Sequence, residues 1–401
     1  MFTKITTGAL AALAALTLTA APATAAAGKA AAGKAAAGKA EAGKATAGTA
    51  GAGRDDALRK ELQRLVKEHG FPGALGTVRD KSGRVRHVTA GVADLKTKAK
   101  IPADAYVRIA SNTKTYTAVV VLQLAGEGKI DLDAPVEKYL PKVIRGNGND
   151  GRKITVRMLL NHTSGLPNYT QYMPSILELR DTYQEPYDLL RQGLGHKRLF
   201  PPGKDWAYSN TGYVALGLLI QEVTGRPIQE EITKRIIKPL GLRHTYWPGP
   251  GVQTIRDPHP TGYHIGEPGA KPVDITEIDP SWGWAAGQLI ARPSDVNRFF
   301  VALMDGKLLK PQQLKEMKET VKLKNFLPGF EYGLGMFKIK LSCGGHIWGH
   351  GGDIDGYETR NGVTEDGRAV SFALTALPKA NDEKAALAGF QSLDRVFCAT
   401  G

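Results

Sequence analysis

The two ends of the chain carry the same pattern, an amphipathic helix next to a pair of strands. Near the N-terminus, leucines fall on one face of a predicted helix over 55–70, and two strands follow over 73–91 around a Lys-Ser-Gly-Arg turn. Near the C-terminus, a hairpin over 356–377 turns at an Asp-Gly pair, and an amphipathic helix covers 381–398. This arrangement predicts one antiparallel sheet that both chain ends complete.

Residues 110–284 show mostly helical periodicity, interrupted by loops rich in proline and glycine. The chain has 401 residues, of which 42% are hydrophobic, and this is enough for a large core. We predict an α/β (α+β) fold, with helices flanking an antiparallel sheet built from residues 55–109 and 285–401. In this fold, residues 110–284 form an inserted, mostly helical lobe. A binding site is expected in a cleft between the two lobes.

The first 25 residues have the features of a secretory signal peptide. A lysine precedes a short alanine-rich apolar run, which ends in Ala23-Thr24-Ala25, a small-x-small cleavage pattern. A membrane anchor is the alternative, but the run is short, and no later stretch is long enough to span a membrane. We therefore expect a secreted, extracellular protein, cleaved after about Ala25, with no integral membrane span in its mature form.

Residues 26–54 are dominated by a repeated five-residue unit, A-A-A-G-K. Glycine in every unit weakens an alanine helix, and no large apolar side chain is present to build a core. We expect a flexible, basic linker or pro-segment. Two roles stay open for this tail, which are binding an anionic cell-wall polymer and spacing the globular part of the chain from the membrane.

The formal net charge of the chain is +14. The leader contributes one positive charge and the repeat three, which leaves +10 for residues 54–401. A basic globule outside the cell favours anionic surfaces or substrates. We expect no nucleic-acid partner, because no basic cluster is interleaved with stacking aromatic residues and the leader directs the chain out of the cell.

Cys343 and Cys398 are the two cysteines of the chain. An even pair in an exported protein predicts one disulfide, here between a strand and the last helix, and two buried thiols are the alternative. No histidine or cysteine lies near either one at zinc-finger spacing, and glycines around His346 and His350 disfavour a helical metal pair. We predict no metal and no cofactor.

Ser111 and Lys114 stand at the start of a predicted buried helix. The segment over 112–125 becomes almost uninterruptedly apolar from Ala118 onward. Ser111 lies at the N-terminus, where free N–H groups favour negative charge, and Lys114 follows on the same face. A serine becomes nucleophilic beside a base, and burial can make a lysine that base. Alone, the S-x-x-K pattern is weak, since a capping serine and a snorkelling lysine give it too.

Two further motifs carry reactive or adaptable groups. The first is Tyr208-Ser209-Asn210, whose phenol can relay a proton and whose amide can hold a carbonyl group. In the second, His350-Gly351-Gly352, small residues let a substrate backbone approach a strand, and histidine adds a tunable polar group. Taken singly, each has a purely structural interpretation, as a turn or as the end of a strand.

The order S-x-x-K, Y-x-N, H-x-G resembles that of the penicillin-recognising serine hydrolases. The likeness is to the branch with class C β-lactamases and secreted D-alanyl-D-alanine carboxypeptidases, and with D-aminopeptidase, D-peptidase and esterase relatives. It runs from about residue 55 to the C-terminus. It includes the stretches "ITVRMLLNHTSGLPNY", "PPGKDWAYSNTGYVALGLLIQEVTG", "SWGWAAG" and "YGLGM". The "LSCGG" and final "FC" stretches resemble the disulfide pair of the secreted carboxypeptidases.

This resemblance implies a β-lactamase/transpeptidase-like fold and an acyl-enzyme mechanism with Ser111 as the nucleophile. Lys114 and Tyr208 would share the general-base and proton-return roles. The backbone N–H groups of Ser111 and Asp353 would form the oxyanion hole. Asn210 would orient the substrate amide, and Trp282 would line the cleft. The predicted substrate-binding residues are Asn210, Trp282, Phe337, His350, Gly351, Gly352 and Asp353.

The sequence departs from the carboxypeptidase pattern where a substrate carboxylate would bind. Relatives that release a terminal D-alanine use an arginine before the third motif and the hydroxyls of an H-T-G-T stretch. Here Phe337 stands at the arginine position, and Gly351 and Asp353 replace the two threonines. An aspartate would repel a carboxylate. Lys338 and Lys340 alternate with Phe337 along a strand, so we expect them to point away from the site.

These departures favour a D-stereospecific peptidase or amidase that cleaves peptide, amide or ester bonds at D-amino acids. Its apolar pocket would lie near Phe337 and Trp282, and Asp353 would attract a free amine, as in a D-aminopeptidase. One alternative is a D-alanyl-D-alanine carboxypeptidase acting on cell-wall peptides. Others are a class C-like β-lactamase, an esterase and a non-catalytic penicillin-binding protein, so β-lactams are further candidate ligands. The sequence leaves open the scissile bond, the deacylation rate and the oligomeric state.

Overall fold

The structure is a computed structural model that describes residues 49–266, 270–324, 326–378 and 382–399. The predicted signal peptide and residues 26–48 of the predicted linker lie outside the described residues. Helix α1 (Thr49–His69) begins earlier than the predicted helix, so residues 49–54, which the sequence pattern assigned to the linker, are helical. The amphipathic turns that follow, which pack against the sheet, stabilise this extension.

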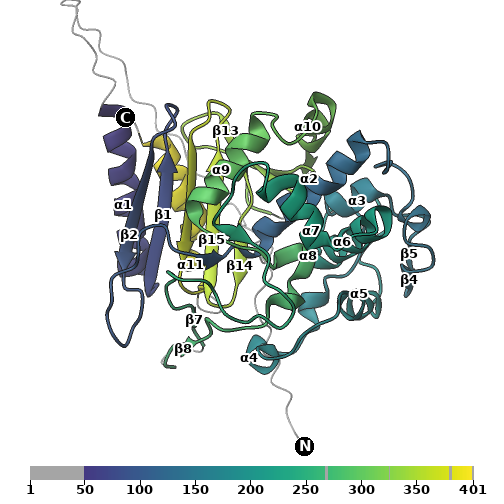
Figure 1. Cartoon of the computed structure of the whole chain (residues 1–401), viewed down its shortest axis with the longest axis horizontal. Helices are drawn as coiled ribbons and strands as arrows, with labels where there is room; N and C mark the ends of the chain where they lie inside the picture. The colour runs from purple at the N-terminus through teal and green to yellow at the C-terminus, as the bar shows by residue number, and fades with distance from the viewer. Residues whose placement is uncertain (1–48, 267–269, 325, 379–381, 400–401) are drawn as a thin grey trace, which may run out of the picture.

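A nine-stranded sheet forms the centre of the fold, and every pairing within it is antiparallel (Figure 1). The strand order is β10-β11-β12-β13-β15-β16-β1-β2, with β14 paired to β15. Strand β1 from the N-terminal hairpin lies next to β16 from the C-terminal hairpin, so both chain ends complete the sheet as predicted. The strands are β1 (Gly73–Arg79), β2 (Val85–Gly91), β10 (Val321–Lys322), β11 (Phe330–Tyr332), β12 (Phe337–Lys340), β13 (His346–Gly349), β14 (Gly352–Ile354), β15 (Tyr357–Val363) and β16 (Ala369–Leu374).

Helices cover both faces of the sheet (Figure 1). Helix α1 packs against β1, β2 and α11 (Glu383–Cys398), which in turn contacts β15 and β16. Helix α9 (Pro293–Met304) packs against β1, β15 and β16 from the opposite face. The predicted leucine face of α1 is fully buried at Leu58, Leu62 and Leu65. Burial of these apolar faces is the main driving force that holds the helices on the sheet.

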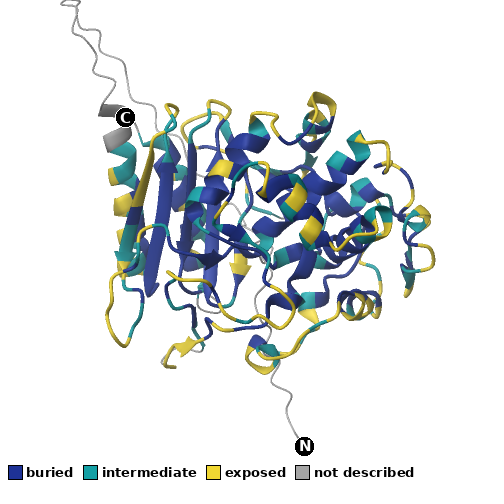
Figure 2. Ribbon diagram, in the orientation of Figure 1, coloured by how far each residue is buried: buried dark blue, intermediate teal, exposed yellow. Residues whose placement is uncertain are grey.

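The middle of the chain forms a group of mostly short helices beside the sheet (Figure 1). Its central helix, α2 (Thr113–Gly126), is buried along nearly its whole length, as an apolar pattern on all sides predicts (Figure 2). Strands β3 and β9 pair where the chain enters and leaves this region. The other helices are α3 (Val156–Leu160), α4 (Ile176–Leu179), α5 (Pro186–Leu194), α6 (Asn210–Thr224), α7 (Ile228–Ile232), α8 (Trp284–Gly287) and α10 (Pro311–Met317). Short strands are β3 (Val107–Arg108), β4 (Arg145–Gly146), β5 (Asn149–Asp150), β6 (Thr245–Tyr246), β7 (Tyr263–His264), β8 (Val273–Asp274) and β9 (Ile290–Ala291).

The predicted disulfide joins Cys343 to Cys398, with a Cα–Cα distance of 5.5 Å. Cys398 ends α11, but Cys343 lies in the turn between β12 and β13 and not in a strand as expected. The glycine pair after Cys343 adopts positive φ, which ends the strand before the cysteine and reverses the chain. Among the described residues, no helix is long and apolar enough to cross a membrane.

Candidate active site

Ser111, the candidate nucleophile, and Lys114, its candidate base, meet at the start of α2. After β3, Ala110 adopts a left-handed φ of +44° and leads into the 3-10 turn Ala110–Asn112, which places Ser111 at the entrance of the helix. One turn later, Lys114 Nζ lies 2.9 Å from Ser111 Oγ and 2.8 Å from the carbonyl oxygen of Ala286. The structure therefore brings the two residues of the S-x-x-K motif into direct hydrogen-bond contact.

The surroundings of Lys114 favour its neutral form. The side chain is fully buried, and no carboxylate of the described residues forms an ion pair with it. Burial lowers the pKa of Lys114 well below its usual value, while the negative charge of Asp353 acts in the opposite direction. The rings of Tyr208 and Tyr213 lie 4.8 and 5.6 Å from Nζ and offer only weak stabilisation to an ammonium group. An unprotonated Lys114 can accept the proton of Ser111.

Tyr208 completes a group of three reactive side chains. The centroid of its ring lies 4.8 Å from Lys114 Nζ, and burial of the phenol raises the pKa of Tyr208 well above its usual value, while the Ser111 hydroxyl acts in the opposite direction. Tyr208 therefore stays protonated at neutral pH, although the residue keeps partial contact with solvent. A protonated phenol next to the nucleophile can return a proton to a leaving group.

Asn210 and Trp282 are both hydrogen-bonded to one short turn, Tyr169–Gln171. Asn210 Nδ2 donates to Thr170 Oγ1 at 3.4 Å. The neighbouring Tyr169 donates its hydroxyl to the carbonyl oxygen of Trp282. Both predicted substrate-binding residues are half-buried, so part of each side chain remains accessible.

His162 is a site residue that the sequence reasoning did not identify. Its ring centroid lies 4.4 Å from that of Tyr208, and its Nδ1 accepts the backbone N–H of Ser209 at 3.2 Å. Burial lowers the pKa of His162 well below its usual value, so the ring is neutral and Nδ1 is available as an acceptor. This hydrogen bond ties His162 to the backbone of the Y-x-N turn. The stretch that contains it, "ITVRMLLNHTSGLPNY", resembles the family, but the pattern assigns no role to this histidine.

The third motif places a neutral histidine beside an aromatic cluster. Burial, followed by the charge of Lys114, lowers the pKa of His350 to about 3, and its Nε2 lies 3.1 Å from Tyr332 Oη. The ring of Phe337 packs against His350 with a centroid distance of 5.2 Å and is only 6% exposed. Phe337 therefore packs against His350 in the interior and offers little surface to a substrate. The sequence had instead placed it in the wall of an apolar pocket. Lys338 lies on the other face of the strand, 3.9 Å from Glu331.

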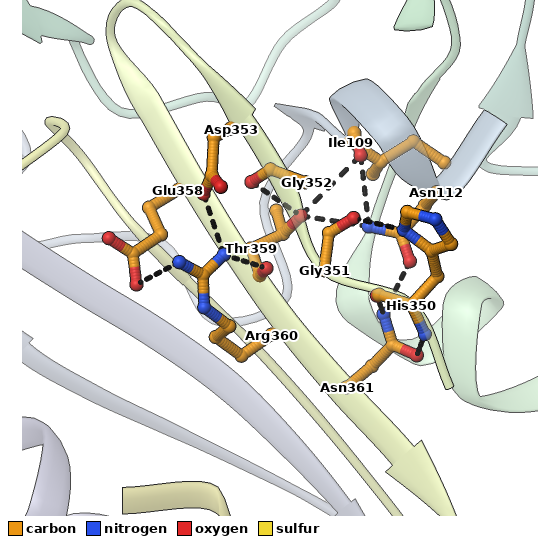
Figure 3. Close-up of polar contacts among 10 residues, drawn as sticks. All are labelled: Ile109, Asn112, His350, Gly351, Gly352, Asp353, Glu358, Thr359, Arg360 and Asn361. Carbon is orange, nitrogen blue, oxygen red and sulfur yellow. Dashed lines mark hydrogen bonds and ion pairs between the residues drawn. The ribbon is translucent and has the colours of Figure 1, made fainter. Parts of the chain in front are cut away.

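Asp353 is paired with a buried arginine (Figure 3). Its carboxylate, 44% exposed, lies 2.6 Å from Arg360 Nη1, and the Arg360 side chain is 4% exposed. Arg360 also lies 3.1 Å from the fully buried Glu358. This pairing weakens the repulsion of a substrate carboxylate that the sequence predicted. The negative charge of Asp353 still acts on two residues of the candidate site, because it raises the pKa of both Lys114 and Tyr208.

Gly352 allows the two predicted oxyanion donors to lie close together. A Cβ atom at Gly352 would collide with the carbonyl oxygen of Ile109 and would lie 2.6 Å from Thr359 Oγ1. Only a glycine therefore lets β14, with the N–H of Asp353, approach the turn that carries Ser111. No group of three metal-ligating side chains occurs among the described residues.

A half-buried serine and tyrosine beside a fully buried lysine, at the N-terminus of a central helix next to an antiparallel sheet, define a penicillin-recognising type of serine hydrolase. A model of the Beta-lactamase family matches residues 58–393, and the chain belongs to this family.

Several solved structures are similar to this chain, and they include an amidohydrolase and an amidase. The chain is similar to a D-stereospecific amidohydrolase from Streptomyces sp., with 40% identity and a TM-score of 0.77, over 86% of this chain and 99% of that one. It is also similar to D-amino acid amidase from Ochrobactrum anthropi SV3 complexed with L-phenylalanine amide, with 27% identity and a TM-score of 0.77, over 86% and 98% of the two chains. Putative penicillin-binding protein PbpX of Bacillus subtilis (strain 168) is 28% identical over 318 residues, which is 78% of this chain and 72% of that protein.

Proposed function

We propose that the protein is a D-stereospecific amidohydrolase that forms an acyl-enzyme at Ser111. The observation that carries this proposal is the 2.9 Å contact between Ser111 Oγ and the buried amine of Lys114. The similarity to a D-stereospecific amidohydrolase, at 40% identity over nearly the whole of that chain, supports the substrate class.

In the proposed reaction, Ser111 Oγ attacks the carbonyl carbon of a D-aminoacyl amide, and the Ser111 proton passes to Lys114 Nζ. The N–H groups of Ser111 and Asp353 donate to the carbonyl oxygen as it becomes negative. The C–N bond then breaks, and the amine leaves with a proton returned through Lys114 and Tyr208. Water next attacks the ester, the Ser111 hydroxyl re-forms, and the D-amino acid is released.

The third motif supports an amide or amine-bearing substrate over one that ends in a carboxylate. The arginine and the two hydroxyls that would bind a carboxylate in the carboxypeptidases are replaced by Phe337, Gly351 and Asp353. Asp353 is 44% exposed, so a substrate ammonium group can reach it in addition to Arg360. A free α-amino group is therefore the feature that we expect this carboxylate to recognise.

The test compares the initial rates of hydrolysis of D-phenylalanine amide, L-phenylalanine amide and a peptide that ends in D-alanyl-D-alanine. We expect the D-amide to be the preferred substrate and Ser111→Ala to abolish its hydrolysis. Asp353→Asn should raise KM for D-phenylalanine amide more than for its N-acetyl derivative, which lacks the positive charge. A strong preference for the D-alanyl-D-alanine peptide would overturn the assigned specificity.

We further propose that the protein is secreted. The signal-like leader and the Cys343–Cys398 disulfide both support an oxidising, extracellular location. Expression with the native leader should release into the medium a protein whose N-terminus lies close to Ala26. An uncleaved protein that stays with the cells would contradict this proposal.

A further inference from the structure

A buried hydrogen-bond network joins the segment of Ser111 to the segment of Asp353 (Figure 3). Asn112, fully buried, donates from Nδ2 to the carbonyl oxygen of Ile109 at 2.9 Å and to Thr359 Oγ1 at 2.8 Å. Thr359, 6% exposed, donates in turn to the carbonyl oxygen of Gly352 at 3.2 Å. The network therefore begins beside one predicted oxyanion donor and ends beside the other.

The donor directions in this network are fixed by its outer members. Asn361 donates from Nδ2 to Asn112 Oδ1, which sets the orientation of the Asn112 amide, and it also donates to the carbonyl oxygen of His350. Asn112 must then donate to Thr359 Oγ1, so the hydroxyl proton of Thr359 is free to point elsewhere. Of its two acceptors, Gly352 O at 3.2 Å is nearer than Ile109 O at 3.4 Å.

The carbonyl group of Gly352 and the N–H of Asp353 belong to the same planar peptide unit. In a trans peptide these two groups point in opposite directions. A hydrogen bond that holds Gly352 O toward β15 therefore holds the N–H of Asp353 away from β15. The same hydrogen bond polarises the peptide, which makes this N–H a stronger donor.

We propose that Thr359 is a positioning residue of the oxyanion hole, acting through the Gly352–Asp353 peptide. This inference rests on the proposed acyl-enzyme function. Thr359 lies on β15 opposite Gly352 and makes its contribution without touching the substrate itself. Its hydroxyl orients one of the two N–H groups that stabilise the developing negative charge, and Asn112 directs the hydroxyl proton.

The test uses Thr359→Val, which keeps the shape of the side chain and removes the hydroxyl, and Thr359→Ser, which restores it. Thr375→Val is the matched control, because Thr375 is a buried threonine whose hydroxyl donates to the carbonyl oxygen of Gly73 at 3.2 Å, on a different strand pair. We expect Thr359→Val to lower kcat for D-phenylalanine amide by about tenfold or more with little change in KM. Thr359→Ser and Thr375→Val should stay within about threefold of the wild type.

Two further measurements separate orientation from a general structural effect. The affinity of a boronic acid analogue of D-phenylalanine, which mimics the tetrahedral oxyanion, should fall in parallel with kcat, while the affinity of D-phenylalanine should not change. The rate of acylation by a labelled penicillin should fall by a similar factor, which tests the hole independently of amide specificity.

The possible outcomes distinguish the two proposals. Wild-type turnover with an unchanged Thr359→Val variant would overturn the role of Thr359 and leave the proposed function standing. An equal loss in Thr359→Val and Thr375→Val would also overturn it. A wild-type protein that neither hydrolyses D-amides nor reacts with penicillin would overturn the proposed function and this inference with it.

Discussion

Replacement of Gly352 by alanine tests the close approach on which the proposed oxyanion hole depends. The added Cβ would lie 2.6 Å from Thr359 Oγ1 and 3.0 Å from Asn112 Nδ2, and it would collide with the carbonyl oxygen of Ile109. Ordinary contacts of this kind are about 3.5 Å, so the strand and the turn must separate by roughly 1 Å. A displacement of about 1 Å at reacting groups typically costs about a hundredfold in rate, or ~2.7 kcal/mol of barrier.

The assay is kcat for D-phenylalanine amide, measured with a thermal melt of each variant. Gly249→Ala is the control, because its added Cβ would meet only Val252 Cγ2 at an ordinary 3.6 Å in an exposed loop. We expect Gly352→Ala to lose about a hundredfold in kcat while it remains folded, and Gly249→Ala to behave like the wild type. A Gly352→Ala variant that turns over at the wild-type rate would refute the assigned position of the oxyanion hole.

Three further predictions concern pH and stability. The acid limb of the pH profile of kcat/KM should reflect deprotonation of Lys114, far below the usual lysine pKa. Asp353→Asn should move this limb to lower pH, because the Asp353 charge raises the pKa of Lys114. An acid limb that this substitution does not move would contradict the coupling between the two residues. Burial raises the pKa of Glu358 from 4.5 to about 8, so its stabilising contribution is full below pH 4.5 and is lost as the pH rises to about 8. Melting temperatures from pH 4 to 9 should therefore fall less steeply in Glu358→Gln than in the wild type, and parallel curves would argue against this shift. Cys343 and Cys398 are 55 residues apart, and replacing both by serine should lower the free energy of unfolding by about 4 kcal/mol in urea titrations. An unchanged urea midpoint of unfolding would show that the disulfide does not constrain the unfolded chain.

Much of the fold could be predicted because its signals are local. The leucine spacing of α1 and the Asp-Gly turn between β15 and β16 lie within short windows, and both gave the correct elements. The turn position of Cys343 was not predicted, since the end of β12 depends on two glycines at positive φ and on the disulfide that ties the turn to α11.

The contacts around the candidate site were harder to predict. The three motifs predicted candidate reactive residues, because their residue types carry that information directly, and the structure brings Ser111 and Lys114 into contact. The residues that contact these motifs could not be predicted from the sequence. Asn112 and Thr359, for example, lie 247 residues apart, and their contact depends on how β14 and β15 pair in the folded chain. Arg360 was missed for the same reason, and so the sequence predicted only that Asp353 repels a substrate carboxylate, without its ion pair.

The stereochemical preference of the wild-type enzyme tests the account most directly. Initial rates with D- and L-phenylalanine amide, measured alongside Ser111→Ala, report both the substrate class and the nucleophile. We predict hydrolysis of the D-amide at a rate far above that of the L-amide, and no hydrolysis by Ser111→Ala. Equal rates for the two amides, or activity that survives in Ser111→Ala, would contradict it.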